Sequence, residues 1–235
     1  MKTAICIGLN YKGTSSELGG CENDAKNMKR FLTSQGFNVE LLFSIGVKDL
    51  VERLNFIKSV HTKDDTFVLT YSGHGTKLFS SKESDSYDEA LVLFKNGYEY
   101  LIDDDLRSLL ESISGNAFYV LDSCYSGGME RFTNPYFKGK LGKKKFTISN
   151  KLTSELPRFK ADKNLQNRLY GIFASDEKEV SWDLGDRGLF TDQFLKELKV
   201  NNRISTVIKN VREGCQGRQT PRWFTNSGNG YKKLF

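Results

Sequence analysis

The sequence predicts an α/β protein with a mainly parallel six-stranded sheet that carries helices on both faces. The main observation is that short apolar runs alternate with amphipathic runs from one end of the chain to the other. A second observation is the length of 235 residues, which is enough for one large domain with a sizeable core. Strands that alternate with helices in this way run parallel to one another within one sheet.

Three strands and two helices are predicted in the first half of the chain. The first helix places Ala25, Met28 and Leu32 on one face and is closed by Gly36. In chain order the elements are a strand at 4–8, a helix at 23–35, a strand at 37–43, a helix at 47–60 and a strand at 66–71.

The second half continues the alternation after a loop at 80–88 that is rich in serine and acids. Three consecutive aspartates open the next helix, where negative charge is favourable at the positive N-terminal end. The elements are a short strand at 90–94, a helix at 103–113, strands at 117–121 and 170–174, helices at 189–198 and 205–213, and a sixth sheet strand in the glycine-rich tail.

The net charge of +6 is unevenly distributed along the chain. Between residues 129 and 168, eleven Lys or Arg residues stand against three acids, so this segment carries +8 and the remainder about −2. Such blocks most often form solvated loops, and a processing or regulatory linker is the next interpretation. Nucleic-acid contact is the least favoured, because no RNP motif, zinc finger or helix-turn-helix accompanies the basic residues.

Cysteine usage and hydropathy predict a cytoplasmic protein with no membrane partner. The four cysteines are scattered without a CxxC pair, which argues against a disulfide framework or a zinc site. No apolar run reaches the roughly 18–20 residues that cross a bilayer, and the first residues read as a strand rather than a signal peptide. Cys6 and Cys215 are expected to pack in the interior, and His61 to lie on the surface.

The segments with the most chemical information follow three of the predicted strands. Residues 71–75 read Tyr-Ser-Gly-His-Gly, residues 122–128 read Asp-Ser-Cys-Tyr-Ser-Gly-Gly, and residues 21–24 read Cys-Glu-Asn-Asp. In parallel sheets, ligands bind beyond the carboxyl ends of the strands, where loops from neighbouring strands meet. We therefore expect these three segments to form one site.

Cys124 and His74 suit a cysteine nucleophile and its base. A cysteine attacks a carbonyl carbon as the thiolate, and a histidine removes the thiol proton. The backbone N–H groups of Gly75 and Cys124 are the candidates to stabilise the resulting oxyanion. A lone cysteine at a strand end is most often a small buried hydrophobe, but the flanking motif and the His motif favour catalysis here.

At these motifs the chain resembles a caspase-fold cysteine peptidase of the metacaspase branch, whose prokaryotic members are called orthocaspases (peptidase family C14, clan CD). The spacing of about 50 residues between His74 and Cys124 also matches that of caspases. Individually the matching segments are weak, but they occur in family order over nearly the full length. The matching segments are 5–11, 20–25, 71–75, 87–90, 102–106, 122–127, 174–176, 188–191 and 219–221.

The resemblance implies a caspase-like fold, a Cys124–His74 dyad and endopeptidase activity through a thioester acyl-enzyme. It implies one peptidase domain over 1–235, with a large-subunit-like part at 1–128, the basic linker at 129–168 and a small-subunit-like part at 169–235. Protein or peptide substrates and a monomeric state are expected, and an upstream activator stays open.

The resemblance also predicts the specificity of cleavage. Metacaspases hold an Arg or Lys side chain at P1 with carboxylates, and Asp24 and Asp122 match those positions, with Ser72 and Cys21 lining the S1 pocket. Physical chemistry favours the same interpretation, because two carboxylates pair well with a guanidinium and are poor hosts for an acidic group. Two alternatives stay open: Asp24 as an acid at a helix N-terminus, and Asp122 as a residue that orients the Cys124 loop.

Calcium is the one cofactor that the resemblance raises, and no other is expected. The positions that match calcium ligands of metacaspases are Asp88, Asp103, Asp104 and Asp105. Where the family has a further aspartate, this chain has Arg131 beside Glu130, and a cation cannot ligate calcium. We therefore expect calcium independence, with the three consecutive acids capping a helix.

A peptidase that prefers Arg or Lys would be able to cut its own basic linker. The candidate positions are Lys143, Lys144, Lys145 and Lys151. Two other functions stay open: a catalytically silent or partner-activated interaction module with the same fold, and an Asp-specific caspase-like peptidase. The intact Cys/His pair argues against the silent module, because scaffolds commonly lose one of the two.

Overall fold

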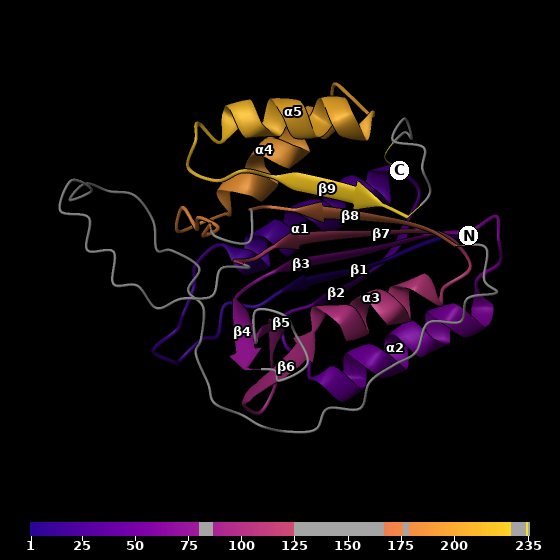
Figure 1. Ribbon diagram of the computed structural model, residues 1–235, viewed down its shortest axis with the longest axis horizontal. Coiled ribbons are helices and arrows are strands. Elements are labelled where there is room, and N and C mark those ends of the chain that lie inside the picture. The colour runs from indigo at the N-terminus through magenta and orange to yellow at the C-terminus, as the bar shows by residue number, and fades with distance from the viewer. Residues whose placement is uncertain (80–86, 125–166, 176–178, 227–233, 235) are drawn as a thin grey trace.

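A computed structural model of the chain describes residues 1–79, 87–124, 167–175, 179–226 and 234 (Figure 1). Its main sheet has six strands, and only the last of them runs antiparallel to its neighbour. The prediction of a mainly parallel six-stranded sheet is confirmed. In spatial order the strands are β2 (Asn38–Leu42), β1 (Lys2–Gly8), β3 (Thr66–Ser72), β7 (Gly115–Asp122), β8 (Asn167–Phe173) and β9 (Arg222–Thr225).

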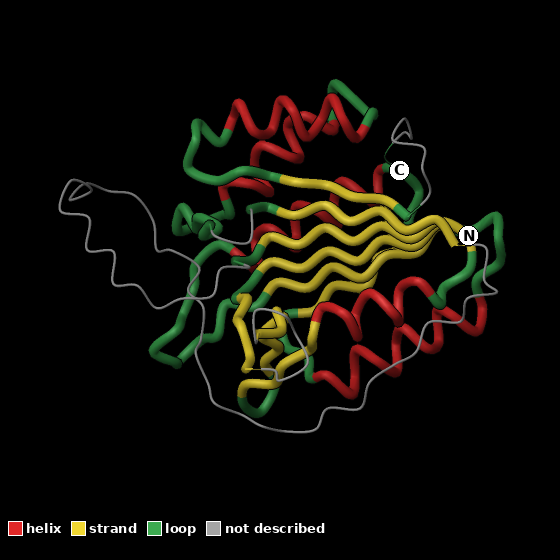
Figure 2. The backbone as a smooth tube through the Cα atoms, in the orientation of Figure 1, coloured by secondary structure: helices red, strands yellow, loops and turns green. Residues whose placement is uncertain are grey.

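Helices cover both faces of this sheet, as predicted (Figure 2). On one face lie α1 (Cys21–Ser34), α4 (Leu189–Leu198) and α5 (Ile204–Gly214), and on the other α2 (Val47–Val60) and α3 (Asp103–Glu111). The two cores follow from the alternation of side chains along each strand. In β3, Phe67 and Leu69 pack in the core with α2 and α3, whereas Val68 packs in the core with α1, α4 and α5.

The three strands that precede the chemical motifs, β1, β3 and β7, lie side by side in the centre of the sheet. β1 pairs with β3 from Lys2↔Thr66 to Gly8↔Ser72, and β3 pairs with β7 up to Ser72↔Asp122. Because all three run parallel, their carboxyl ends lie at one edge of the sheet. We call this edge the carboxyl edge and the opposite one the amino edge.

A second, three-stranded antiparallel sheet was not predicted. It consists of β4 (Gly75–Phe79), β5 (Tyr87–Phe94) and β6 (Tyr98–Ile102), in that order. Only a short strand at 90–94 was expected there, and β5 in fact begins at Tyr87, inside the predicted loop. Five-residue strands carry little periodicity of their own, and pairing with β5 determines their conformation.

The prediction that His61 lies on the surface is wrong. The residue caps the C-terminus of α2 and is only 6% exposed. Its Nε2 lies 2.7 Å from the Thr3 hydroxyl, and its ring packs edge-on against Phe67. Burial, together with the nearby amino terminus, lowers the pKa of His61. The polar flanking sequence gave no sign of this packing.

The expected packing of two cysteines is confirmed. Cys6 and Cys215 are fully buried, and burial raises the pKa of the first thiol to about 11 and of the second to about 12. No helix in the described part of the chain is long and apolar enough to cross a membrane. Residues 129–166, which hold nearly all of the basic linker, lie outside the described residues.

Candidate active site

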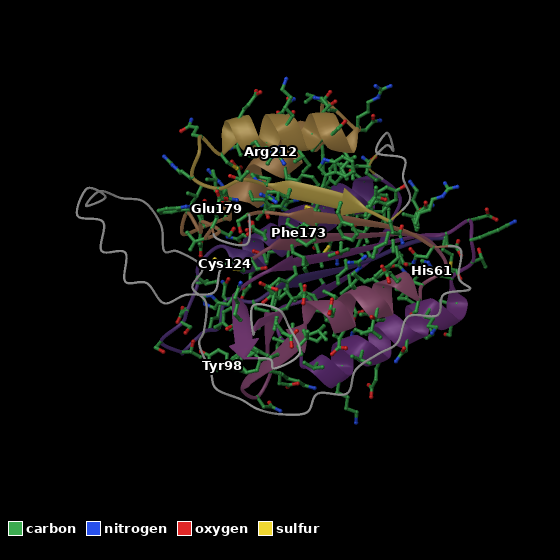
Figure 3. All side chains as sticks on the ribbon, in the orientation of Figure 1. His61, Tyr98, Cys124, Phe173, Glu179 and Arg212 are labelled. Carbon is green, nitrogen blue, oxygen red and sulfur yellow. The ribbon has the colours of Figure 1, made fainter. Side chains whose placement is uncertain are left out.

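The two motifs that contain His74 and Cys124 touch through their backbones. Gly75 follows His74 and lies directly against the carbonyl of Cys124: a Cβ added there would be 1.8 Å from that oxygen. The Gly73 N–H donates to the Asp122 carbonyl over 3.3 Å. The glycines therefore allow the end of β7 to lie against the loop after β3, and Figure 3 shows Cys124 at this end of the sheet.

His74 is fully buried, and its surroundings fix which ring nitrogen carries the proton. Nε2 lies 2.7 Å from the backbone oxygen of Ser16. A carbonyl oxygen only accepts hydrogen bonds, so Nε2 is the N–H nitrogen and Nδ1 of the neutral ring carries the free lone pair. Ser16 was not predicted to belong to the site, because no local pattern marks the loop between β1 and α1.

Two buried tyrosines hold the backbone of His74. The His74 N–H donates to the Tyr11 hydroxyl over 2.8 Å, and the Tyr71 hydroxyl donates to the His74 carbonyl over 2.7 Å. The Tyr11 ring also packs on the imidazole, with 4.6 Å between ring centroids. Both hydroxyls contact the carbonyl of Val92 in β5, so the small antiparallel sheet helps to position the candidate base.

Cys124 lies just beyond the end of β7 and is fully buried. Its Sγ accepts a hydrogen bond from the backbone N–H of Ser181 over 3.0 Å. The Ser181 peptide group therefore lies directly against the sulfur of the candidate nucleophile. Ser181 was not predicted, and nothing in its immediate sequence distinguishes it from an ordinary loop serine.

The carboxylates of Asp24 and Asp122, which we call the carboxylate pair, converge on Gly188 at the N-terminus of α4. A Cβ on Gly188 would lie 2.8 Å from Asp24 Oδ2 and 2.3 Å from Asp122 Oδ2. Both aspartates are 1% exposed. The structure thus brings together the two acids that the sequence analysis assigned to the S1 pocket, at the carboxyl edge beside Cys124.

Each member of the carboxylate pair accepts several hydrogen bonds from other parts of the chain. Asp24 accepts from the Ser72 hydroxyl (2.7 Å) and from the Gly188 N–H (2.8 Å to Oδ1). Asp122 accepts from the hydroxyls of Ser181 (2.5 Å) and Thr191 (2.7 Å). The N-terminus of α4 therefore faces both acids, and its dipole stabilises their negative charge.

A groove of about 1040 Å³ between α1 and α4 has Asp24 and Thr191 in its lining, together with basic side chains such as Arg30, Arg187 and Lys196; Asp122, His74 and Cys124 do not line it. Cys21, the fourth residue assigned to the pocket, is buried at the start of α1. Its carbonyl faces the backbone of Gly8, where an added Cβ would lie 2.2 Å from the oxygen. Ser72 and Cys21 thus both lie next to Asp24, the first by hydrogen bond and the second on the same helix.

The four acids assigned to calcium lie on β5 and at the start of α3. Burial, followed by the charges of Asp104, Glu89 and Asp88, raises the pKa of Asp103 to about 7. Asp105 is buried. Within the described ranges, no three His, Cys, Asp or Glu side chains come together in an arrangement that would hold a metal ion.

Several assigned residues lie outside the described part of the chain. They are the remainder of the Cys124 motif (125–128), Glu130 and Arg131, and the candidate self-cleavage positions Lys143, Lys144, Lys145 and Lys151.

Residues 1–230 match Peptidase_C14, the caspase domain. The chain belongs to this family. The resemblance inferred from the motifs is therefore confirmed. The fold prediction is confirmed as well, since solved caspase structures share the architecture.

Curated relatives of this caspase-domain chain are metacaspases. Metacaspase-1 of Cryptococcus neoformans is 32% identical over 145 residues, which cover 54% of this chain and 32% of the relative. Metacaspase-6 of Arabidopsis thaliana is 34% identical over 145 residues, 54% of this chain and 39% of the relative. The matched region thus spans about a third of the length of these relatives.

Solved structures with the same fold include a bacterial and an insect protein. Protein GSU0716 of Geobacter sulfurreducens superposes with a TM-score of 0.78 at 22% identity, over 100% of this chain and 98% of that one. The Drosophila initiator caspase Dronc superposes with a TM-score of 0.60 at 11% identity, over 100% and 82% of the two chains. At these identities the likeness concerns the fold.

Proposed function

We propose that the chain is a cysteine endopeptidase that cleaves after Arg or Lys, with Cys124 as nucleophile and His74 as base. The observation that supports this most strongly is the carboxylate pair beside the Cys124 strand end. Two buried carboxylates fit a guanidinium or ammonium group, which donates to both of them. An acidic P1 side chain would instead meet like charge, so the Asp-specific alternative is disfavoured.

In the proposed reaction, Nδ1 of His74 takes the proton of the Cys124 thiol, and Sγ attacks the scissile carbonyl carbon. The oxyanion that forms is stabilised by the N–H groups of Gly75 and Cys124. The C–N bond then breaks, the leaving amine takes the proton from His74, and a thioester remains. Water, deprotonated by His74, hydrolyses the thioester and regenerates the thiol. No step requires a metal ion.

The decisive experiment measures cleavage of fluorogenic peptides ending in Arg, Lys or Asp, with calcium or with a chelator. We expect cleavage after Arg and Lys, which Cys124→Ala abolishes. Asp24→Asn keeps the size of the side chain and removes its charge, so kcat/KM for basic peptides is expected to fall about 100-fold, the scale of an unpaired buried ion. Asp65→Asn, which changes a buried acid at the amino edge, is the matched control.

Each alternative gives a different result in this experiment. Cleavage after Asp, or basic cleavage that survives Asp24→Asn, would contradict the pocket assignment. If no peptide is cleaved under any condition, the partner-activated or catalytically silent module is favoured. Activity that disappears with chelator would contradict the proposed independence of calcium.

We further propose that the enzyme cuts its own basic linker and acts as a cytoplasmic monomer. The support for self-cleavage is the match between a carboxylate-lined S1 pocket and the eleven basic residues of 129–168. Purified active protein is expected to separate into two bands on a denaturing gel, whereas Cys124→Ala remains one band. Replacement of the four candidate lysines by glutamine tests the positions, and light scattering of both proteins tests the monomer.

A further inference from the structure

Ser181 contacts both the candidate nucleophile and the candidate specificity pocket. It lies between β8 and α4 and is fully buried. Its backbone N–H donates to Cys124 Sγ over 3.0 Å, and its hydroxyl donates to Asp122 Oδ1 over 2.5 Å. A single residue therefore links the thiol to the carboxylate pair.

The segment around Ser181 is held firmly on both sides. The Glu179 carboxylate accepts from the N–H and hydroxyl of Thr220, and the Trp182 N–H donates to Gln219 Oε1 over 3.1 Å. Gln219 in turn donates to the carbonyl of Ala174 at the end of β8. The residues on either side of Ser181 are thus anchored to the core, whereas Ser181 itself bonds Cys124 and Asp122.

In this arrangement the thiol lies against the Ser181 peptide group and is not accessible to a substrate. Cys124 is fully buried, with Sγ against the Ser181 peptide group. Attack on a scissile carbonyl requires Sγ to leave this peptide group. Ser181 also donates its hydroxyl to Asp122. A basic P1 side chain would compete with this hydroxyl, because a guanidinium donates to the same carboxylate.

We propose that Ser181 is a positioning residue that couples occupancy of the S1 pocket to release of the Cys124 thiol. With no P1 side chain bound, Ser181 holds Asp122 and the thiol together. When a cationic P1 side chain binds, the Ser181 O–H···Asp122 bond is exchanged for a guanidinium N–H···Asp122 bond, the Ser181 peptide group shifts between its anchored neighbours, and its N–H no longer holds Sγ. This inference rests on the proposed function, namely a basic P1 side chain at the carboxylate pair.

Alkylation of Cys124 tests the coupling without any peptide cleavage. The probes are iodoacetamide and n-butylguanidine, with the neutral isostere n-butylurea as control, and mass spectrometry follows the peptide that contains Cys124. In the wild-type protein, butylguanidine is expected to accelerate alkylation about tenfold, the factor for exchange of one ordinary hydrogen bond, and butylurea to have no effect.

Two variants separate coupling from packing. Ser181→Ala keeps the N–H and loses the hydroxyl, so alkylation is expected to be fast without butylguanidine and to rise less than about twofold with it. Ser181→Thr retains a hydroxyl and is expected to restore the dependence. Thr191→Val is the matched control, since it removes a hydroxyl bond to the same Asp122 from a residue of α4: the acceleration is expected to persist, at higher butylguanidine concentration.

A second readout is cleavage of a peptide that ends in norleucine. If the cation is what releases the thiol, Ser181→Ala raises the rate on this neutral peptide relative to an arginine peptide, which a purely structural role would not do. If Ser181→Ala does not fold, alkylation of the wild-type protein with butylguanidine and with butylurea still tests the proposal.

The outcomes distinguish failure of the coupling from failure of the proposed function. If butylguanidine inhibits cleavage of arginine peptides competitively but leaves alkylation unchanged or slows it, the S1 pocket stands and the role of Ser181 is wrong. If butylguanidine does not bind and arginine peptides are not cleaved, the proposed function fails and the coupling fails with it.

Discussion

The two edges of the sheet each bury a histidine and an aspartate, yet they differ in how the buried carboxylates are arranged. Figure 3 shows His61 and Cys124 at opposite ends of the sheet. At the amino edge, the Asp65 carboxylate accepts from the N–H and hydroxyl of Thr62 and also bonds the charged amino terminus of Met1. At the carboxyl edge, Asp24 accepts from Ser72 and from Gly188, which is 164 residues away.

This difference shows what distinguishes a site from a structural turn. A carboxylate that already bonds the charged amino terminus has its charge matched within the chain, whereas two carboxylates that converge on one helix N-terminus can both accept from one cationic group. Burial of a polar side chain is common to both edges and identifies neither. Convergence of two carboxylates on one backbone position is the feature found at the carboxyl edge.

The histidines give the largest expected contrast between the edges. His74→Gln removes the proposed base, and kcat/KM for an arginine peptide is expected to fall on the order of 10⁴-fold. His61→Gln is expected to leave kcat/KM within about twofold, because the residue lies at the other end of the sheet. Steady-state kinetics on both folded variants, checked by circular dichroism, measures this. Equal losses would contradict the division between the edges.

Two glycines give a contrast in both stability and activity. Gly75→Ala puts a methyl group against the Cys124 carbonyl, so we expect about 1–3 kcal/mol of destabilisation and a fall in kcat/KM of about 100-fold as the dyad is displaced. Gly115 lies at the start of β7 at φ +90°, and an added Cβ would be 2.4 Å from the Asp65 carbonyl.

Gly115→Ala is therefore the control for Gly75→Ala. It is expected to lower the free energy of unfolding at least as much, by about 1–3 kcal/mol, through overpacking and backbone strain. The activity of the remaining folded protein should stay within about twofold of wild type. Urea unfolding and active-site titration measure the two quantities, and a large loss of activity per folded molecule in Gly115→Ala would refute the contrast.

The smallest expected effect is the pH dependence of stability that His61 contributes. Burial lowers the pKa of His61 below the usual 6.5, so the unfolded chain binds the proton more readily. The stabilisation is complete above the unfolded pKa and is lost as the pH falls through the folded pKa. Between about pH 7.5 and about pH 5, His61→Gln should therefore lose less unfolding free energy than wild type. An equal loss in both proteins would show that His61 does not contribute.

The sequence was sufficient for the parts of the molecule that repeat a pattern or sit at strand ends. The alternation of strands and helices predicted the sheet and both helical layers, and the helix at 47–60 has the predicted bounds. Asp24 and Asp122 could be assigned to one site because the strands that precede them run parallel, and in the structure both strands pair with β3. The roles of Cys124, His74 and the carboxylate pair in catalysis stay predictions for the experiments above.

The sequence was insufficient where a contact joins segments that carry no pattern. Ser16 and Ser181 are ordinary loop serines, and their contacts with His74 and Cys124 span 58 and 57 residues of chain. β4 and β6 are too short to show a period. The polar residues around His61 predicted an exposed ring. The ring is buried instead because it lies against Thr3 and Phe67, which are distant from this pattern in the sequence or on the next strand.

The contact between Asp24 and Gly188 has a consequence for the protein during its synthesis. Ribosomes add roughly 5–20 residues per second, so the 164 residues between these two take roughly ten to thirty seconds to follow. During that interval β3 and β7 are synthesised while the N-terminus of α4 does not yet exist. The nascent chain therefore carries its cysteine and histidine before Gly188 reaches the carboxylate pair, and under the proposed function it selects a basic side chain only after α4 has begun to be translated.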